Sequence, residues 1–114
     1  MNESPHEFAK RRERGSERLL DGAPRSIKRF FALDADVYAA GVLPKKTKEL
    51  LGLVASTVLR CNDCIAYHLG EAAEAGATRE ELVEALGIAL VVGGSITIPH
   101  LRFASDFLDA MAEG

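Results

Sequence analysis

The segment CNDCIAYH, residues 61–68, contains both cysteines of this 114-residue chain and one of its three histidines. On a helix that turns about 100° per residue, Cys61, Cys64 and His68 fall within an arc of about 60°. A thiol reacts as its thiolate, which a neighbouring imidazole and the positive end of a helix both stabilise. The spacing therefore predicts a redox-active cluster at a helix start. The alternative is a pair of cysteines that only fill an apolar core.

Glu49 lies on the helix predicted before this segment, over residues 44–60, where apolar residues recur at helical spacing. If the two helices fold back on one another, its carboxylate is placed to orient His68 or to accept its proton. The alternative is that Glu49 is a solvated partner of Lys45 or Lys46 on the same helix.

Glu49, Cys61, Cys64 and His68 together match the pattern E-x11-C-x2-C-x3-H. This pattern resembles the signature of the alkylhydroperoxidase D-like branch of the carboxymuconolactone decarboxylase family, and the similarity extends over roughly residues 25–112. The resemblance implies an all-α fold, a thiol peroxidase or disulfide reductase activity, and association into trimers or hexamers. It also implies that Cys64 attacks as thiolate, Cys61 resolves, His68 activates, and Glu49 ends a proton relay.

Asp63 departs from the family pattern, because peroxidase members often have His immediately before the second cysteine. A carboxylate beside a thiol disfavours the thiolate and so opposes the helix end and His68. The alternative is that Asp63 simply complements the helix dipole from the first turn. This departure makes thiol-redox chemistry a stronger expectation than peroxidase activity.

The whole chain reads as helical, with about six helices and no strand alternation. We expect a charged N-terminal helical segment over residues 1–22 and an alkylhydroperoxidase D-like domain over residues 23–114. Pro, Gly and capping signals place helices at 5–20, 24–41, 44–60 and 62–76, a fifth from Thr78 to Gly93-Gly94, and a sixth after that break.

Residues 85–92 of the fifth predicted helix are apolar all round rather than along one stripe. Such a helix should be buried on both faces, and a domain of this size has few layers with which to cover it. We therefore expect a homo-oligomer in which a partner subunit covers the second face, with Gly87 and Ala89 permitting close approach. The alternative is that one subunit buries this helix unaided.

Composition excludes several classes of function. The net charge of −3 gives no general attraction to nucleic acid, and the basic run at residues 10–14 reads as a solvated helix face. The longest uncharged run, residues 85–98, is too short to cross a bilayer. No signal sequence or motif for a metal, flavin or nucleotide cofactor is visible. We expect a cytoplasmic protein, where paired cysteines are more often catalytic than structural.

These observations predict an oligomeric thiol oxidoreductase that reduces a hydroperoxide substrate and is restored by an external dithiol reductant. One rival is a zinc-binding module that uses the two cysteines, His68 and Glu49. Another is a lactone decarboxylase-like or non-catalytic assembly protein of the same family. His100 and Tyr67 are secondary candidates, whose ordinary alternatives are a polar or interface residue and a packing residue.

Overall fold

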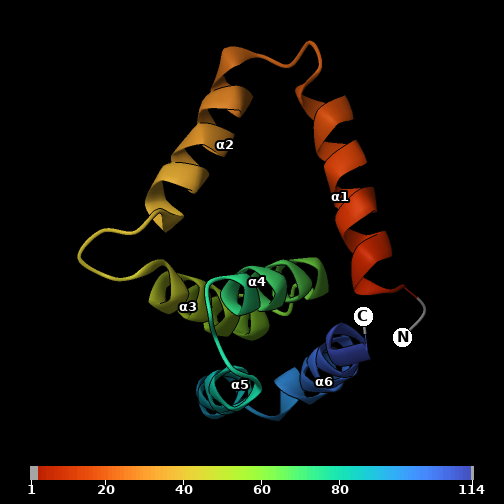
Figure 1. The fold of residues 1–114 in the computed structure, drawn as a ribbon, viewed down its shortest axis with the longest axis vertical. Coiled ribbons are helices and arrows are strands. Elements are labelled where there is room, and N and C mark those ends of the chain that lie inside the picture. The colour runs from red at the N-terminus through yellow and green to blue at the C-terminus, as the bar shows by residue number, and fades with distance from the viewer. Residues whose placement is uncertain (1–2, 114) are drawn as a thin grey trace.

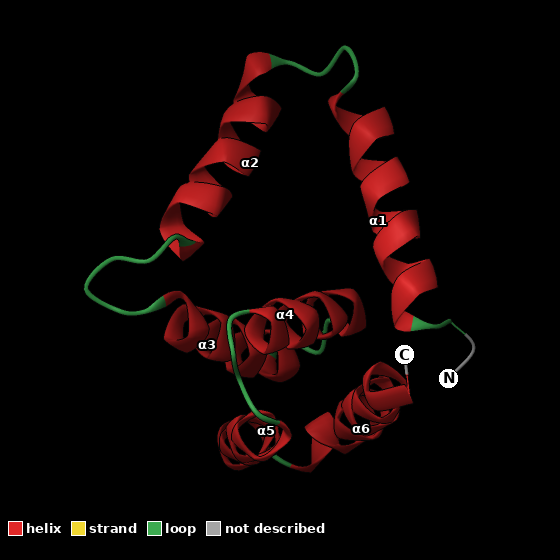
Figure 2. Ribbon diagram, in the orientation of Figure 1, coloured by secondary structure: helices red, strands yellow, loops and turns green. Residues whose placement is uncertain are grey.

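The computed structural model describes residues 3–113, which form six α-helices and one 3₁₀ turn and contain no strand (Figures 1 and 2). The helices are α1 (Pro5–Leu20), α2 (Arg25–Tyr38), α3 (Lys45–Val58), α4 (Asn62–Glu74), α5 (Arg79–Gly93) and α6 (Ile98–Glu113), with the turn η1 (Ser95–Thr97) before α6. The prediction of an all-α fold is confirmed. The predicted helix order is also observed, with ends that differ by up to three residues.

Local signals in the sequence explain where several helices begin and end. At the start of α1, the Ser4 side chain accepts from the backbone of Glu7, and the Glu7 carboxylate accepts from the backbone of Ser4. Thr78 and Glu81 form the same capping box at the start of α5, as predicted. Gly94 follows α5 with a φ of +82°, a conformation that glycine adopts without a steric penalty.

The turn between α3 and α4 has an arginine at a position where glycine is the usual residue. Arg60 has a φ of +61°, and its N–H donates to the carbonyl of Thr57, while the N–H of Cys61 donates to the carbonyl of Ser56. These two bonds form a Schellman motif, in which the left-handed residue is usually glycine. The motif ends α3 and places Cys61 at the start of α4.

Helices α3 to α6 enclose one hydrophobic core, to which α1 contributes a single residue, Phe8. In Figure 1, α3 and α4 lie together above α5 and α6. The buried apolar residues that pack together in this core are Phe8, Leu53, Ile65, Ala66, Leu69, Ala72, Leu82, Ala85, Leu86, Ala104, Phe107 and Leu108. Because α3 and α4 are fixed by this shared core, side chains that project between them are held at defined positions.

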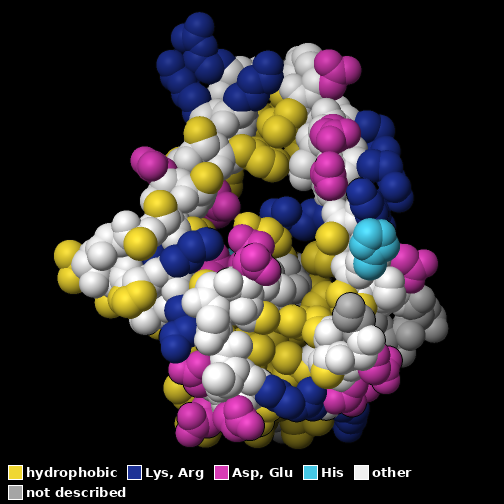
Figure 3. Space-filling view, viewed as in Figure 1, with side chains coloured by type: hydrophobic (Ala, Val, Ile, Leu, Met, Phe, Trp, Pro, Cys, Tyr) yellow, Lys and Arg dark blue, Asp and Glu magenta, His cyan; other side chains and the backbone are white. Residues whose placement is uncertain are grey.

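Helices α1 and α2 form an arm, residues 5–38, that stands away from the core (Figure 1). They meet at residues 21–24 and diverge toward opposite ends of the core, and Figure 3 shows an opening between them. No residue of α2 is buried, and Phe30, Leu33 and Val37 are more than half exposed. A cavity of about 1010 Å³ lies where α1 faces α4 and α6.

The apolar helix α5 is covered on one side only. Leu82, Ala85, Leu86 and Ala89 face the core, whereas the opposite side leaves Val83, Ile88, Val91 and Val92 between 49% and 85% exposed. The alternative that one subunit buries this helix unaided is therefore wrong. Within residues 3–113, no helix has the length and apolar character needed to span a membrane.

Candidate active site

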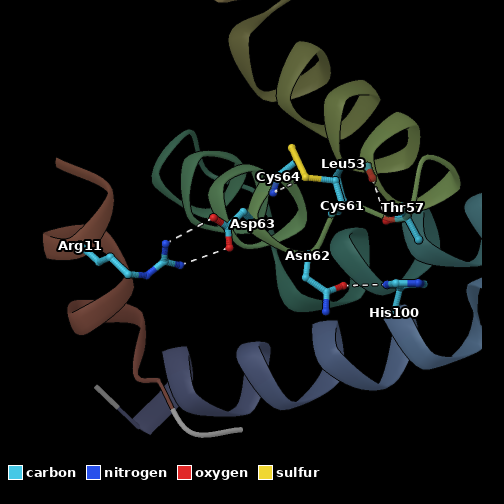
Figure 4. The surroundings of a disulfide bond; sticks show 8 residues. All are labelled: Arg11, Leu53, Thr57, Cys61, Asn62, Asp63, Cys64 and His100. Atoms are coloured by element: carbon cyan, nitrogen blue, oxygen red, sulfur yellow. Dashed lines mark hydrogen bonds and ion pairs between the residues drawn. A yellow bond between two sulfur atoms is a disulfide. The ribbon is translucent and has the colours of Figure 1, made fainter. Parts of the chain in front are cut away.

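The two cysteines lie together at the start of α4, where they are joined by a disulfide (Figure 4). Cys61 is the N-cap residue, and its sulfur accepts from the backbone N–H of Cys64 at 3.2 Å. Their Cα atoms are 5.3 Å apart. Cys64 is exposed and Cys61 is half-buried. The pair is thus accessible and sits at the positive end of a helix, which favours a thiolate when the disulfide is reduced.

A buried carboxylate connects α3 to α4 near the cysteines. Glu49 is fully buried, and its Oε1 accepts from Nδ1 of His68 at 2.7 Å, while its Oε2 accepts from Nζ of Lys45 at 2.7 Å. A carboxylate can only accept, so this bond leaves Nε2 of His68 for proton exchange. Glu49 therefore fixes the ring orientation of His68, which follows Cys64 by one helical turn.

The solvated alternative for Glu49 is wrong, because none of this side chain reaches solvent. Lys45 is nevertheless its partner, and the hydrogen bond from Lys45 to Glu49 raises the pKa of the Lys45 ammonium group. Lys46 instead pairs with Glu81 of α5 at 3.0 Å. The buried carboxylate thus has a cation on one oxygen and an imidazole on the other, as a buried charge requires.

Two residues that the sequence did not single out complete the surroundings of His68. Tyr38, the last residue of α2, places its ring 5.2 Å from the imidazole ring with a tilt of 36°. Gly52 lies directly beneath both groups, because a Cβ added there would lie 2.7 Å from Cε1 of His68 and 2.7 Å from the Tyr38 hydroxyl. Tyr67 contacts the imidazole edge-on, with its ring centroid also 5.2 Å away.

A glycine in the middle of a predicted helix, such as Gly52, is itself a signal in the sequence. Glycine inside a helix costs about 1 kcal/mol relative to alanine, so a mid-helix glycine often marks a close approach of another group. Tyr38 carried no such signal, since it lies thirty residues before His68 in the sequence and belongs to no motif.

The polar residues between the cysteines point away from the sulfur atoms (Figure 4). Asp63 forms an ion pair with Arg11 of α1 at 3.2 Å, and Asn62 Oδ1 lies 2.7 Å from Nδ1 of His100 on α6. Arg11 therefore offsets the negative charge that Asp63 would otherwise present to Cys64. His100 connects the start of α4 to α6, and among the described residues its hydrogen-bond partner is Asn62 rather than Glu49 or His68.

Helix α1 also reaches the site through Tyr67. The guanidinium of Arg12 lies 3.8 Å from the centroid of the Tyr67 ring, a cation–π contact. Burial, followed by the charge of Glu71, raises the pKa of the Tyr67 hydroxyl. The basic run at residues 10–14 is exposed as predicted, yet two of its arginines contact α4.

The ligand set predicted for zinc is not arranged as a metal site. Among the described residues, no group of three His, Cys, Asp or Glu side chains could hold a metal ion. The two sulfurs bond to one another, and both Glu49 oxygens are occupied by His68 and Lys45.

A sequence model of the Carboxymuconolactone decarboxylase family matches residues 24–106. The chain belongs to this family. The resemblance drawn from the cysteine motif is therefore confirmed at the level of the family. Alkyl hydroperoxide reductase AhpD of Mycobacteroides abscessus is 35% identical over 76 residues, which cover 67% of this chain and 42% of that protein. An uncharacterized protein of the cox locus of Paracoccus denitrificans is 35% identical over 80 residues, covering 70% of this chain and 72% of that protein.

Solved structures of the carboxymuconolactone decarboxylase family share the fold. A Thermotoga maritima family member, for which a part in the antioxidative response has been suggested, superposes with a TM-score of 0.88 at 56% identity, covering 93% of this chain and 90% of that one. A family member from Legionella pneumophila superposes with a TM-score of 0.83 at 28% identity, covering 92% and 94%.

Proposed function

We propose that this protein is a thiol-dependent peroxidase or disulfide reductase that works through its cysteine pair, with a hydroperoxide as the favoured substrate. The observation that carries the proposal is the Cys61–Cys64 disulfide at the start of α4, one helical turn before an imidazole fixed by a buried carboxylate. An accessible cysteine pair near a proton acceptor is the arrangement that thiol redox catalysis needs. The similarity to an alkyl hydroperoxide reductase supports this choice within the family.

The first step transfers one oxygen from the hydroperoxide to Cys64. The Cys64 thiolate attacks the terminal peroxide oxygen, the O–O bond breaks, and the leaving alkoxide takes a proton to become an alcohol. Cys64 is thereby oxidised to a sulfenic acid, and the peroxide is reduced. The Cys61 thiol then attacks the sulfur of Cys64, which releases water and forms the disulfide. An external dithiol reductant returns both thiols.

The Glu49–His68 pair supplies the proton transfers of this cycle. Nε2 of His68 accepts the Cys64 proton when the thiolate forms, and the same proton is then available to the leaving alkoxide. Glu49 stabilises the resulting imidazolium through Nδ1, while Lys45 keeps the carboxylate paired when His68 is neutral. Cys64, Cys61, His68 and Glu49 are thus the proposed catalytic set, and the cycle uses no metal or organic cofactor.

The need for a dithiol reductant suits a reducing compartment, so we place this activity in the cytoplasm. We also propose that the working form is a homo-oligomer, a trimer or hexamer, in which a second subunit covers the exposed side of α5. That side exposes Val83, Ile88, Val91 and Val92 and carries the acidic residue Glu84, and so many exposed apolar residues are expected of a subunit interface rather than a solvated surface.

Thiol counting with and without hydroperoxide tests the proposed cycle. Excess cumene hydroperoxide should consume two thiols per reduced chain and form an intrachain disulfide without joining subunits. Cys64→Ser should abolish turnover, whereas Cys61→Ser should leave a single thiol that accumulates as sulfenic acid. Both cysteines remaining free after peroxide treatment, in mass spectra of the whole chain, would refute the proposal and favour a decarboxylase-like or non-catalytic member of the family.

A further inference from the structure

We propose that Tyr38 is a positioning residue that holds the His68 imidazole in its working orientation, and that Lys48 in turn places Tyr38. This inference rests on the proposed function, because it concerns the same proton acceptor. It also gives the otherwise exposed helix α2 a direct part in the site.

The imidazole is enclosed on several sides. Its Nδ1 is bonded to Glu49, its edge contacts Tyr67, and Gly52 lies close beneath it. The Tyr38 ring covers a further side, at 5.2 Å between centroids. Rotation of the imidazole about its Cβ–Cγ bond would break the bond between Nδ1 and Glu49. The aromatic ring of Tyr38 therefore limits rotation of the imidazole and keeps Nδ1 of His68 bonded to the Glu49 carboxylate.

The position of Gly52 indicates that the contact between Tyr38 and His68 is specific rather than accidental. Cε1 and Nδ1 of His68 and the hydroxyl of Tyr38 all lie within 2.9 Å of the point that a Cβ at residue 52 would occupy. Three atoms from two distant helices thus converge on a space that exists only because residue 52 is glycine. Burial and the charge of Glu49 also raise the pKa of the Tyr38 hydroxyl, so this side chain stays neutral near pH 7.

Lys48 holds Tyr38 in place from α3. Its Nζ donates to the backbone carbonyls of Val37 and Ala39, both at 2.7 Å, which are the residues on either side of Tyr38. A lysine at the C-terminus of a helix also complements the negative end of the helix dipole. Because α2 buries no residue of its own, these contacts fix its end against the core.

The test compares variants of Tyr38 with a matched aromatic of the same helix. Tyr38→Leu removes the aromatic ring, Tyr38→Phe keeps it, and Phe30→Leu changes an aromatic that is 67% exposed and far from the site. In a Cys61→Ser background, Tyr38→Leu should slow Cys64 alkylation at pH 7 on the order of tenfold and move the pH profile upward. Tyr38→Phe and Phe30→Leu should stay within about twofold of the parent. Lys48→Met should slow Cys64 alkylation by less than Tyr38→Leu does, but by more than Tyr38→Phe or Phe30→Leu does.

Nitrogen-15 NMR of the His68 ring provides a readout that a merely structural role would not move. Tyr38→Leu should change the His68 ring signals and their titration, while circular dichroism shows unchanged helicity. If His68 signals and alkylation are both unaffected in Tyr38→Leu, the positioning role is overturned.

His68→Gln separates this inference from the proposed function. If His68→Gln slows alkylation and Tyr38→Leu does not, the proposed relay stands and the role of Tyr38 is overturned. If His68→Gln leaves alkylation unchanged, the proposed proton relay fails and the positioning role of Tyr38 falls with it, whereas thiol counting tests the cysteine cycle separately.

Discussion

The core, α3 to α6, and the arm, α1 and α2, are both helical but are stabilised in different ways. The core buries a continuous set of apolar side chains, whereas α2 buries none and α1 buries only Phe8. Phe8 packs edge-to-face against Phe107 of α6 at 6.0 Å. Burial of apolar area is the main stabilising contribution in folding, so a subunit of this shape derives its stability from the core.

The arm touches the core near the candidate active site. Arg11 and Arg12 of α1 contact Asp63 and Tyr67 on α4, and Tyr38 of α2 contacts His68. Of these three contacted residues, His68 belongs to the proposed catalytic set, so the position of α2 bears directly on the proposed site. The exposed apolar residues of α2 and α5 are not covered within one subunit, and we propose that a second subunit covers them.

The largest effect is expected from placing a charge on the exposed side of α5. Val91→Asp should dissociate the oligomer, because burying a charge without a partner costs several kcal/mol. Val91 is 85% exposed in one subunit, so the change should leave the subunit itself folded. Light scattering at micromolar concentration checks the size, with Val91→Ala as the control. A parent protein that is already a monomer would contradict the proposed assembly.

A matched pair of leucines compares the two regions directly. Leu69→Ala on α4 removes a fully buried side chain and should lower the free energy of unfolding by about 2–5 kcal/mol. Leu33→Ala on α2 removes a side chain that is 57% exposed and should cost well under about 1 kcal/mol in dilute protein. Urea unfolding gives both values. Equal costs would mean that the arm is part of the core, and a Leu33→Ala cost that grows with protein concentration would place α2 in a subunit interface.

One substitution, glycine to alanine, should have opposite effects in the two regions. At Gly52 the new methyl group meets His68 and Tyr38, so a cost of about 1–3 kcal/mol outweighs the gain in helix propensity and turnover falls. At Gly15 in α1 a Cβ meets nothing within 4 Å, so Gly15→Ala should stabilise by up to about 1 kcal/mol. Thermal unfolding and peroxide turnover of both variants test this. A Gly52→Ala protein with normal turnover would show that the close packing does not matter.

The smallest effect is expected at the turn that carries the cysteines. Arg60 occupies a left-handed position that favours glycine, so Arg60→Gly should raise the free energy of unfolding by at most about 1 kcal/mol. The gain is limited because glycine also makes the unfolded chain more flexible. Turnover should be unchanged, since the backbone path to Cys61 is preserved. Destabilisation would indicate that the Arg60 side chain has a role beyond the turn.

The sequence was sufficient to predict the fold class, and it proposed four site residues, which the structure joins as two pairs, Cys61 with Cys64 and Glu49 with His68. Helical spacing groups Cys61, Cys64 and His68 because they lie within two turns of one helix, and such local geometry follows from residue order alone. Glu49 was reached through the motif, and its buried bond to His68 depends on how α3 packs on α4. The capping box at Thr78 and the break at Gly94 were predictable because each depends on a few adjacent residues.

Contacts between distant helices could not be predicted in this way. Arg11 offsets Asp63 across 52 residues of sequence, and no charge pattern identifies one arginine of the basic run as its partner. The exposure of α2 was also not foreseen, because apolar residues at helical spacing do not reveal whether their own subunit covers them. Its tertiary position leaves that stripe uncovered within one subunit.

By itself, the sequence determined the helices, their order and the placement of both cysteines at the start of α4, because these depend on interactions within a few turns. Only the tertiary structure decided that Glu49 is buried between Lys45 and His68, that Tyr38 lies against the imidazole, and that Gly52 leaves room for both. Each of these depends on the packing of separate helices. The free energy that fixes such packing comes from apolar burial in the core as a whole, which no local pattern specifies.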